Sequence, residues 1–172
     1  MRLSSALGAG LKLPEGPVLV REPTLGSDLT ALAQPCIETL DILVAEQFSA
    51  HGLPVNEDKA HYAAVLICAP RSKDKARDLI ASAQALTQGP VLVDGQKTDG
   101  IDSLWRACRG RTDVLGAITK GHGRLFWMAP NEAAFEDWVY APPDVHGFAL
   151  APGIFSADGS DPGSYALAEA LP

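Results

Sequence analysis

The side chains that could carry chemistry in this sequence are few, and their spacing matches none of the common catalytic or metal-binding patterns. The four histidines show no HxH or HExxH spacing, and the three cysteines lie far apart with no CxxC pair. The sequence also contains neither a GxSxG nucleophile motif nor a GxxxxGKS/T phosphate-binding loop. From the residues we therefore assign no catalytic residue and no metal site.

One acidic–glycine pair directly follows a strand-like run and forms the candidate cofactor loop. Asp94 and Gly95 end the run VLVDG, in the way an acidic residue and a glycine close many strands that bind nucleotides. Residues 96–98 are Gln, Lys and Thr, at positions where close approach of the backbone to a ligand requires glycine. We expect an ordinary turn between a strand and a helix here, and cofactor binding through residues 94–100 is the alternative.

Basic residues gather in one stretch of the second half of the chain. The whole chain has 14 Lys and Arg against 21 Asp and Glu, and residues 125–172 contain seven acidic residues but no basic one. Proteins that bind nucleic acid over a broad face are usually basic overall, so any contact with RNA must be local. The candidates for that contact are the basic residues within 106–124: Arg106, Arg109, Arg111, Lys120 and Arg124. The alternative is that these side chains are simply solvated.

The elements that position these residues follow from hydrophobic periodicity and from turn-forming residues. Short apolar or β-branched runs predict strands at 16–22, 40–47, 61–69 and 91–95. Polar capping residues followed by helical periodicity predict helices at 28–34, 73–86 and 101–109, with Ser27, Ser72 and Asp99 as caps. Residues 112–118 and 124–129 predict a last pair of strands, and residues 8–10 are read as a loose terminus.

Strands that alternate with helices predict crossover connections and a parallel sheet. The last two strands are joined by only a few residues around 120–123, which is too short for a crossover, so the final strand must run antiparallel. The expected fold class is α/β, with a mainly parallel sheet, helices on both faces and a terminal antiparallel hairpin. This outline is that of the Rossmann-like class I methyltransferase fold, in a degenerate form without its glycine-rich loop.

Composition sets the remaining bounds. A chain of 172 residues with 47% hydrophobic and 20% charged residues has the size and composition of one globular domain. No apolar run approaches the ~18 residues of a membrane-spanning helix, and the N-terminus lacks the compact apolar block of a signal peptide. The odd number of separated cysteines fits reduced thiols, so we expect a cytoplasmic protein without a membrane partner.

The segment APGIFSADGSDPGS at 151–164 resembles the PGVFS-x-DGLDxGS segment of the small-subunit ribosomal RNA guanine-N2 methyltransferases, in the "methyltransferase small domain" group. A weaker likeness extends over about 62–172 and includes LICAPRSKDKARDLIASAQAL and VLVDGQKTDGIDS. Ser160 and Pro162 depart from the family pattern. Proteins of this family look like two tandem methyltransferase-like domains, of which the first has lost cofactor binding and the second is catalytic.

The resemblance implies that this chain is the N-terminal, non-catalytic domain of an S-adenosylmethionine-dependent 16S rRNA guanine-N2 methyltransferase. It would assist RNA binding and support a catalytic domain that follows after this chain ends. We expect a degenerate methyltransferase-like domain over 1–130 and an extended arm over 131–172 that leads to the catalytic domain. By matching position, four residues of the arm would border the S-adenosylmethionine pocket of that domain: Phe155, Ser156, Asp161 and Gly163.

The arm also carries three aromatic residues within a stretch that has no basic side chain. Phe135, Trp138 and Phe148 therefore predict an arm that docks on apolar surface. Two other functions remain open from the sequence. The chain could be a methyltransferase that binds S-adenosylmethionine itself through residues 94–100, or a purely structural partner domain that does not touch RNA.

Overall fold

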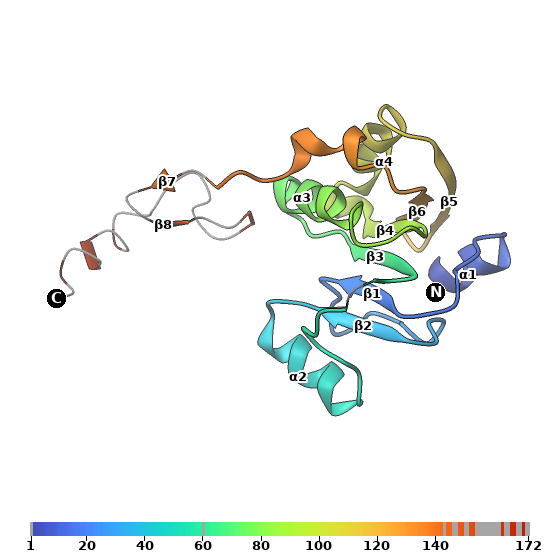
Figure 1. The fold of residues 1–172 in the computed structure, drawn as a ribbon, viewed down its shortest axis with the longest axis horizontal. Helices are drawn as coiled ribbons and strands as arrows, with labels where there is room; N and C mark the ends of the chain where they lie inside the picture. Colours follow the sequence, from blue (N-terminus) through green and yellow to red (C-terminus); the bar gives the residue numbers. More distant parts are fainter. Residues whose placement is uncertain are drawn as a thin grey trace.

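The structure is a computed structural model that describes residues 2–59 and 61–142. Toward the C-terminus it also describes residues 144, 145, 148, 149, 152, 153, 163, 166, 167 and 170. Within this described part, six strands form one sheet in the order β2-β1-β3-β4-β6-β5 (Figure 1). These strands are β1 Val18–Arg21, β2 Pro35–Glu38, β3 Ala64–Cys68, β4 Val91–Gln96, β5 Val114–Lys120 and β6 Gly123–Met128. Two short strands, β7 Asp144–Val145 and β8 Phe148–Ala149, pair with each other.

The sheet is mainly parallel and ends in an antiparallel hairpin, as predicted. Strands β2, β1, β3 and β4 run parallel, whereas β6 is antiparallel to both of its neighbours, β4 and β5. The hairpin turns through Gly121 and His122, which both have a φ of 57°. Two central residues with positive φ are typical of the tight turn that matches the twist of paired strands. The predicted α/β, Rossmann-like fold class is confirmed.

Helices cover both faces of the sheet because successive strand residues point to opposite sides. On one face, Val65 and Ile67 of β3 pack with α3 Lys73–Ala83 and α4 Ile101–Arg109. On the other face, Leu66 packs in a second cluster with buried residues of the two remaining helices. Those helices are α1 Arg2–Gly8 and α2 Ile42–Ala50. The four apolar residues of β3 are all buried, as expected for a central strand flanked on both faces.

Residues 22–50 differ from the prediction. The predicted helix at 28–34 is not formed, and the second strand is instead the short β2 at Pro35–Glu38. The predicted strand at 40–47 is wrong, because these residues belong largely to α2. The Asp41 side chain accepts hydrogen bonds from the backbone N–H groups of Leu43 and Val44, which caps the helix.

The prediction missed one helix and one cap, whereas another cap was predicted correctly. Residues 2–8 form α1, a helix that was not predicted, with Leu3 and Ala6 buried against the sheet. Helix α4 begins after Gly100, whose φ of 80° places it in the left-handed region, and Asp99 does not cap it. Ser72 caps α3 as predicted, by accepting a hydrogen bond from the N–H of Lys75.

The first part of the predicted arm is anchored on the domain. Two short 3₁₀ helices, η2 Glu132–Ala134 and η3 Glu136–Trp138, follow β6, and η3 packs on α3 (Figure 1). Phe135 is fully buried and Trp138 nearly so, with their rings edge to face at a centroid distance of 5.1 Å. These two anchors are confirmed, and the side chain of Phe148 lies outside the described residues. The division into domains at residue 130 stays a prediction.

Candidate functional site at the carboxyl ends of the strands

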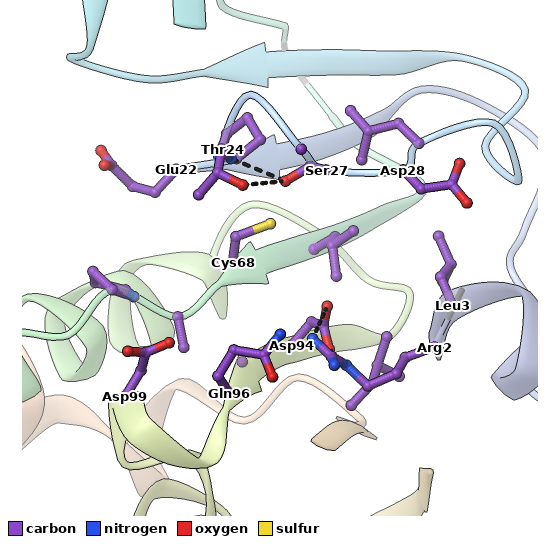
Figure 2. Close-up of a pocket in the computed structure, with 18 of the residues that line it drawn as sticks. Arg2, Leu3, Glu22, Thr24, Ser27, Asp28, Cys68, Asp94, Gln96 and Asp99 are labelled. Carbon is purple, nitrogen blue, oxygen red and sulfur yellow. Dashed lines mark hydrogen bonds and ion pairs between the residues drawn. The ribbon is translucent and has the colours of Figure 1, made fainter. Parts of the chain in front are cut away.

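A cavity of about 910 Å³ lies at the carboxyl ends of the parallel strands. The loop after β1 forms one wall, and the ends of β3 and β4 form the opposite wall (Figure 2). The chain places β2 on one side of β1 and β3 on the other, so the strand order reverses at this point. Open α/β sheets bind ligands most often at such a reversal. We call this cavity the switch-point cavity.

Several charged side chains at the switch-point cavity have partners within the chain. Arg2 from α1 lies beside the end of β4, and its Nε lies 2.5 Å from Oδ1 of Asp94 (Figure 2). On the opposite wall, the Lys75 ammonium lies 2.8 Å from the carboxylate of Glu22. Asp41 accepts the two capping hydrogen bonds of α2 described above. These carboxylates already have intramolecular partners and are less available to a ligand.

The loop after β1 holds its own hydrogen bonds. The N–H of Thr24 donates to the Ser27 hydroxyl at 2.9 Å, and the two hydroxyls lie 3.2 Å apart (Figure 2). Gly26 is the single glycine of this loop, and a Cβ added to it would meet open space. It therefore provides no close contact of the backbone with another group.

The residues at this cavity do not fit a nucleotide-type cofactor held in the usual way. That arrangement needs a glycine-rich turn after the first strand and an acidic residue near the end of the second, free to bind ribose hydroxyls. Glu38 ends β2 at the corresponding place, but its carboxylate lies 2.6 Å from Nη2 of Arg21. The described residues thus lack the glycine turn, and the acid that would bind ribose is already occupied.

The candidate cofactor loop at 94–100 forms one rim of the same cavity. A Cβ on Gly95 would lie 3.1 Å from the Ala69 Cβ and from Cδ1 of Ile101, so this glycine allows close packing of β4 against its neighbours. Residues Lys97–Asp99 form the 3₁₀ turn η1. The observed contacts of this loop support the turn that we expected between a strand and a helix.

Cys68 is the potential nucleophile at this cavity. Burial raises the pKa of its thiol to about 12, with a further rise from the nearby carboxylate of Asp94. The thiol is therefore protonated at neutral pH and is a weak nucleophile. Burial likewise raises the pKa of Cys108 in α4 to about 12.

Two of the five predicted RNA-binding residues lie over the ring of one tryptophan at the junction of α4 and β6, and a third contacts Asp102 nearby. The guanidinium carbons of Arg109 and Arg124 lie 4.8 Å and 4.0 Å from the ring centroid of Trp105. Nε of Arg124 also donates to Asp102 at 2.8 Å, and this hydrogen bond lowers the pKa of that carboxyl. Arg106 is exposed, and its Nε donates to the backbone oxygen of Asp102. We call Arg106, Arg109 and Arg124 the α4 edge.

The structure does not bring the other two predicted residues into this group. Arg111 forms two hydrogen bonds with the carboxylate of Asp137, at 2.5 Å and 2.7 Å, and its guanidinium lies over the ring of Trp138. It thereby holds the arm against the domain. Lys120 lies at the switch-point cavity, where its ammonium donates to the Ser5 hydroxyl. Whether any of the five contacts RNA stays a prediction.

The predicted residues of the arm's far end are not tested. Phe155, Ser156 and Asp161 lie outside the described residues, and Gly163 is described as helical and exposed.

Sequence reasoning also missed a second basic group, formed by Arg71, Lys73 and Arg77 at the start of α3. The sequence signal for it was the run RSKDKAR. Its basic residues stand at a helix start, where the positive end of the helix dipole makes them unfavourable.

Comparison with known proteins gives matches among solved structures. No family model and no curated protein matches the chain. The chain is similar to the 16S rRNA N2 methyltransferase RsmC of T. thermophilus, solved with AdoMet and guanosine, with 20% identity and a TM-score of 0.64. The match covers 97% of this chain and 51% of that one. Protein 1320 of Thermoplasma acidophilum matches over 74% of this chain and 85% of its own, with 15% identity and a TM-score of 0.51.

This chain has a methyltransferase-like fold. At these levels of identity the matches show the fold alone. The chain spans about half the length of the T. thermophilus methyltransferase, so what that enzyme binds and modifies belongs to a protein about twice as long. Among the described residues, no helix is long and apolar enough to cross a membrane.

Proposed function

We propose that this chain is a non-catalytic domain of an S-adenosylmethionine-dependent 16S rRNA guanine-N2 methyltransferase. It assists RNA binding and supports a catalytic domain. The observation that carries this proposal is the match of 97% of the chain to only 51% of a methyltransferase solved with AdoMet and guanosine. The resemblance of residues 151–164 to the segment that joins the two domains of that family supports the same function.

In this proposal the chain itself binds no S-adenosylmethionine. The support is the pairing at the switch-point cavity, where Asp94 is held by Arg2 and Glu22 by Lys75. A cofactor would have to separate charge pairs that are partly shielded from water, which costs free energy before any new contact forms. The cofactor belongs to the catalytic domain, and this chain provides no catalytic residue.

The arm connects the two domains in this proposal. Phe135 and Trp138 hold its beginning on α3. Phe155, Ser156, Asp161 and Gly163 would then border the cofactor pocket of that domain, as the family resemblance implies.

The α4 edge is the proposed RNA contact. Arg106 and Arg109 are exposed, and Arg109 lies over the face of Trp105. A guanidinium that rests on an aromatic ring keeps its N–H groups directed outward and can bind phosphate oxygens in two places. The contact is local, since the chain as a whole carries a net charge of −7.

The test is the affinity of the chain for a fragment of 16S rRNA, measured by fluorescence anisotropy at several salt concentrations. We expect Arg106→Glu/Arg109→Glu to weaken binding at least tenfold. It should also reduce the salt dependence by roughly 0.7–0.9 log units per log of salt for each lost phosphate contact. The matched control is Lys12→Glu/Lys59→Glu, which makes the same charge change at two exposed lysines outside α4.

Equal affinity in the Arg106→Glu/Arg109→Glu variant and in the control would overturn the α4 edge as the RNA contact. Absence of RNA binding by the unmodified chain would overturn its role in RNA binding and leave a purely structural role. Arg111 is kept in all variants, because its replacement would also release Asp137 and the arm.

A further inference from the structure

A second, smaller cavity lies between the first turns of α3 and α4. Its volume is about 290 Å³, and it adjoins the switch-point cavity because Asp99 lines both. Three cationic side chains and two hydroxyl side chains face it together with that one carboxylate: Arg71, Lys73, Arg77, Thr98, Ser103 and Asp99. We call it the α3–α4 cavity.

The three cations of the α3–α4 cavity form no ion pair among the described residues. Within residues 2–59 and 61–142, the arginines and lysines that form ion pairs are Arg2, Arg21, Lys75, Arg111 and Arg124. In the same ranges, Arg71, Lys73 and Arg77 have no carboxylate within ion-pair distance. Three positive charges therefore share one concave site with a single acidic residue.

Arg77 gives the most specific sign of a missing partner. Its Nε is buried and has no hydrogen-bond acceptor among the described residues, although the side chain as a whole is half-buried. Its guanidinium carbon lies 5.2 Å from the ring centroid of Trp138, so the aromatic ring of the arm supports it from one side. Buried polar groups are almost always hydrogen-bonded, which makes this Nε without a hydrogen bond, on a residue that lines a cavity, a candidate ligand contact.

The two helix starts add to the positive potential of this cavity. Arg71 and Lys73 stand at the beginning of α3, where the helix dipole disfavours positive charge. Helix α4 begins at Gly100 without a side-chain cap, so no side-chain oxygen accepts a hydrogen bond from its first N–H groups. An anion bound here would neutralise the cations and interact favourably with both helix ends.

We infer that the α3–α4 cavity binds a phosphate group of the RNA backbone. Guanidinium, ammonium and hydroxyl groups are the usual donors to phosphate oxygens, and a cavity of this size accommodates a phosphate with part of its sugar. The source of the phosphate rests on the proposed function. The site itself rests on the unpaired cations, and a free phosphate compound is the other possible source.

The test asks first whether the cavity binds phosphate and then whether that phosphate belongs to RNA. Inorganic phosphate is titrated into the ¹⁵N-labelled chain at constant ionic strength, and the amide shifts of residues 71–77 and 98–104 are followed by NMR. The variant is Arg71→Glu/Lys73→Glu, because both side chains are exposed and their replacement spares the core. Arg77→Lys, which keeps the charge but loses the planar group, serves as the second variant. Lys12→Glu/Lys59→Glu is again the matched control.

We expect saturable shifts in the unmodified chain and the control, no saturable shift in Arg71→Glu/Lys73→Glu, and weaker binding in Arg77→Lys. In the RNA assay, Arg71→Glu/Lys73→Glu should weaken binding at least tenfold relative to the control. Absence of phosphate shifts in the unmodified chain would overturn the site. Phosphate shifts with unchanged RNA affinity would overturn the RNA backbone as the source and indicate a free phosphate compound.

These outcomes are independent of the α4 edge. If Arg106→Glu/Arg109→Glu alone weakens RNA binding and no phosphate shift occurs, the proposed function stands and this inference fails. If only the α3–α4 variants weaken RNA binding, this inference stands and the α4 edge fails.

Discussion

The two cavities at the carboxyl edge of the sheet share one residue, Asp99, but differ in how their charges are used. At the switch-point cavity, the cations Arg2 and Lys75 are neutralised by carboxylates of the same chain. At the α3–α4 cavity, Arg71 and Lys73 have no such partner among the described residues. The larger cavity has the usual position of a ligand site in this kind of sheet, yet the smaller one has the unpaired groups. The position of a cavity in a fold is therefore a weaker guide to ligand binding than the pairing of its side chains.

The difference comes from segments outside the sheet. Helix α1 supplies the arginine that pairs with Asp94 at the switch-point cavity, and the arm supplies the tryptophan that supports Arg77 beside the α3–α4 cavity. Substitutions that weaken the contacts of Arg2 or of the arm test this difference, and they follow in order of decreasing effect on stability.

Phe135→Ala removes the most buried anchor of the arm. The side chain is fully buried and contacts Trp138 edge to face, so the substitution should lower the free energy of unfolding by about 3–5 kcal/mol. Urea denaturation of both proteins measures this difference. The control is Val139→Ala in the same segment, where the side chain is 58% exposed and the expected change is within about 0.5 kcal/mol. A change below about 1 kcal/mol for Phe135→Ala would show that the arm is not part of the core.

Arg2→Ala removes the positive charge beside Asp94 at the switch-point cavity. It leaves the Asp94 carboxylate, which is 27% exposed, without its partner. We expect a loss of about 1–2 kcal/mol in unfolding free energy, between the values of exposed and buried ion pairs. A double-mutant cycle with Asp94→Ala isolates the interaction of the two side chains. A coupling energy of zero would mean that this ion pair does not stabilise the cavity. Arg71→Ala is the control, because Arg71 forms no ion pair among the described residues.

The parts of the fold that could be predicted from sequence are those with long periodic patterns. Helix α4 was placed correctly because Leu104 and Cys108 recur at helical spacing, and β3 because its apolar run is bounded by proline. Strand β2 has only four residues and begins with Pro35, so its pattern is too short to be distinguished from a loop. In α2 the apolar run fits strand and helix equally, and the capping hydrogen bonds of Asp41 decide between them.

The candidate sites were less predictable, because charge pairing is a tertiary property. Arg111 meets a carboxylate 26 residues away, and Arg2 meets one 92 residues away. Sequence spacing grouped Arg111 with Arg109. In the fold, Arg111 pairs with Asp137 of the arm, whereas Arg109 forms no ion pair within residues 2–59 and 61–142. The same reasoning explains why Arg71 and Lys73 were not singled out, since nothing local shows that they lack partners.

The Arg111–Asp137 pair should make a small, pH-dependent contribution to stability. The hydrogen bonds from Arg111 lower the pKa of Asp137 below its ordinary value of 3.8. A carboxyl group whose pKa is lower in the folded state than in the unfolded state stabilises the fold at pH values above the unfolded-state pKa. That stabilisation is lost as the pH falls through the folded-state pKa. We expect Asp137→Asn to lose less stability than the unmodified chain when the pH falls from about 5 to below 3, measured by urea midpoints.

Asp113→Asn is the control for this experiment, since Asp113 is exposed and forms no ion pair within residues 2–59 and 61–142. Identical acid dependence of Asp137→Asn and the unmodified chain would show that the pair does not hold the arm in solution.

The most direct test of the account is a calorimetric titration of this chain with S-adenosylmethionine. The pairing of Arg2 with Asp94 and of Lys75 with Glu22 predicts no saturable heat of binding at millimolar cofactor. The Arg2→Ala variant should also show none, because its loop after β1 still lacks a glycine-rich turn. The T. thermophilus methyltransferase, solved with AdoMet, is the positive control in the same buffer. Stoichiometric binding of S-adenosylmethionine to this chain with a micromolar Kd would contradict the account and favour a cofactor site along residues 94–100.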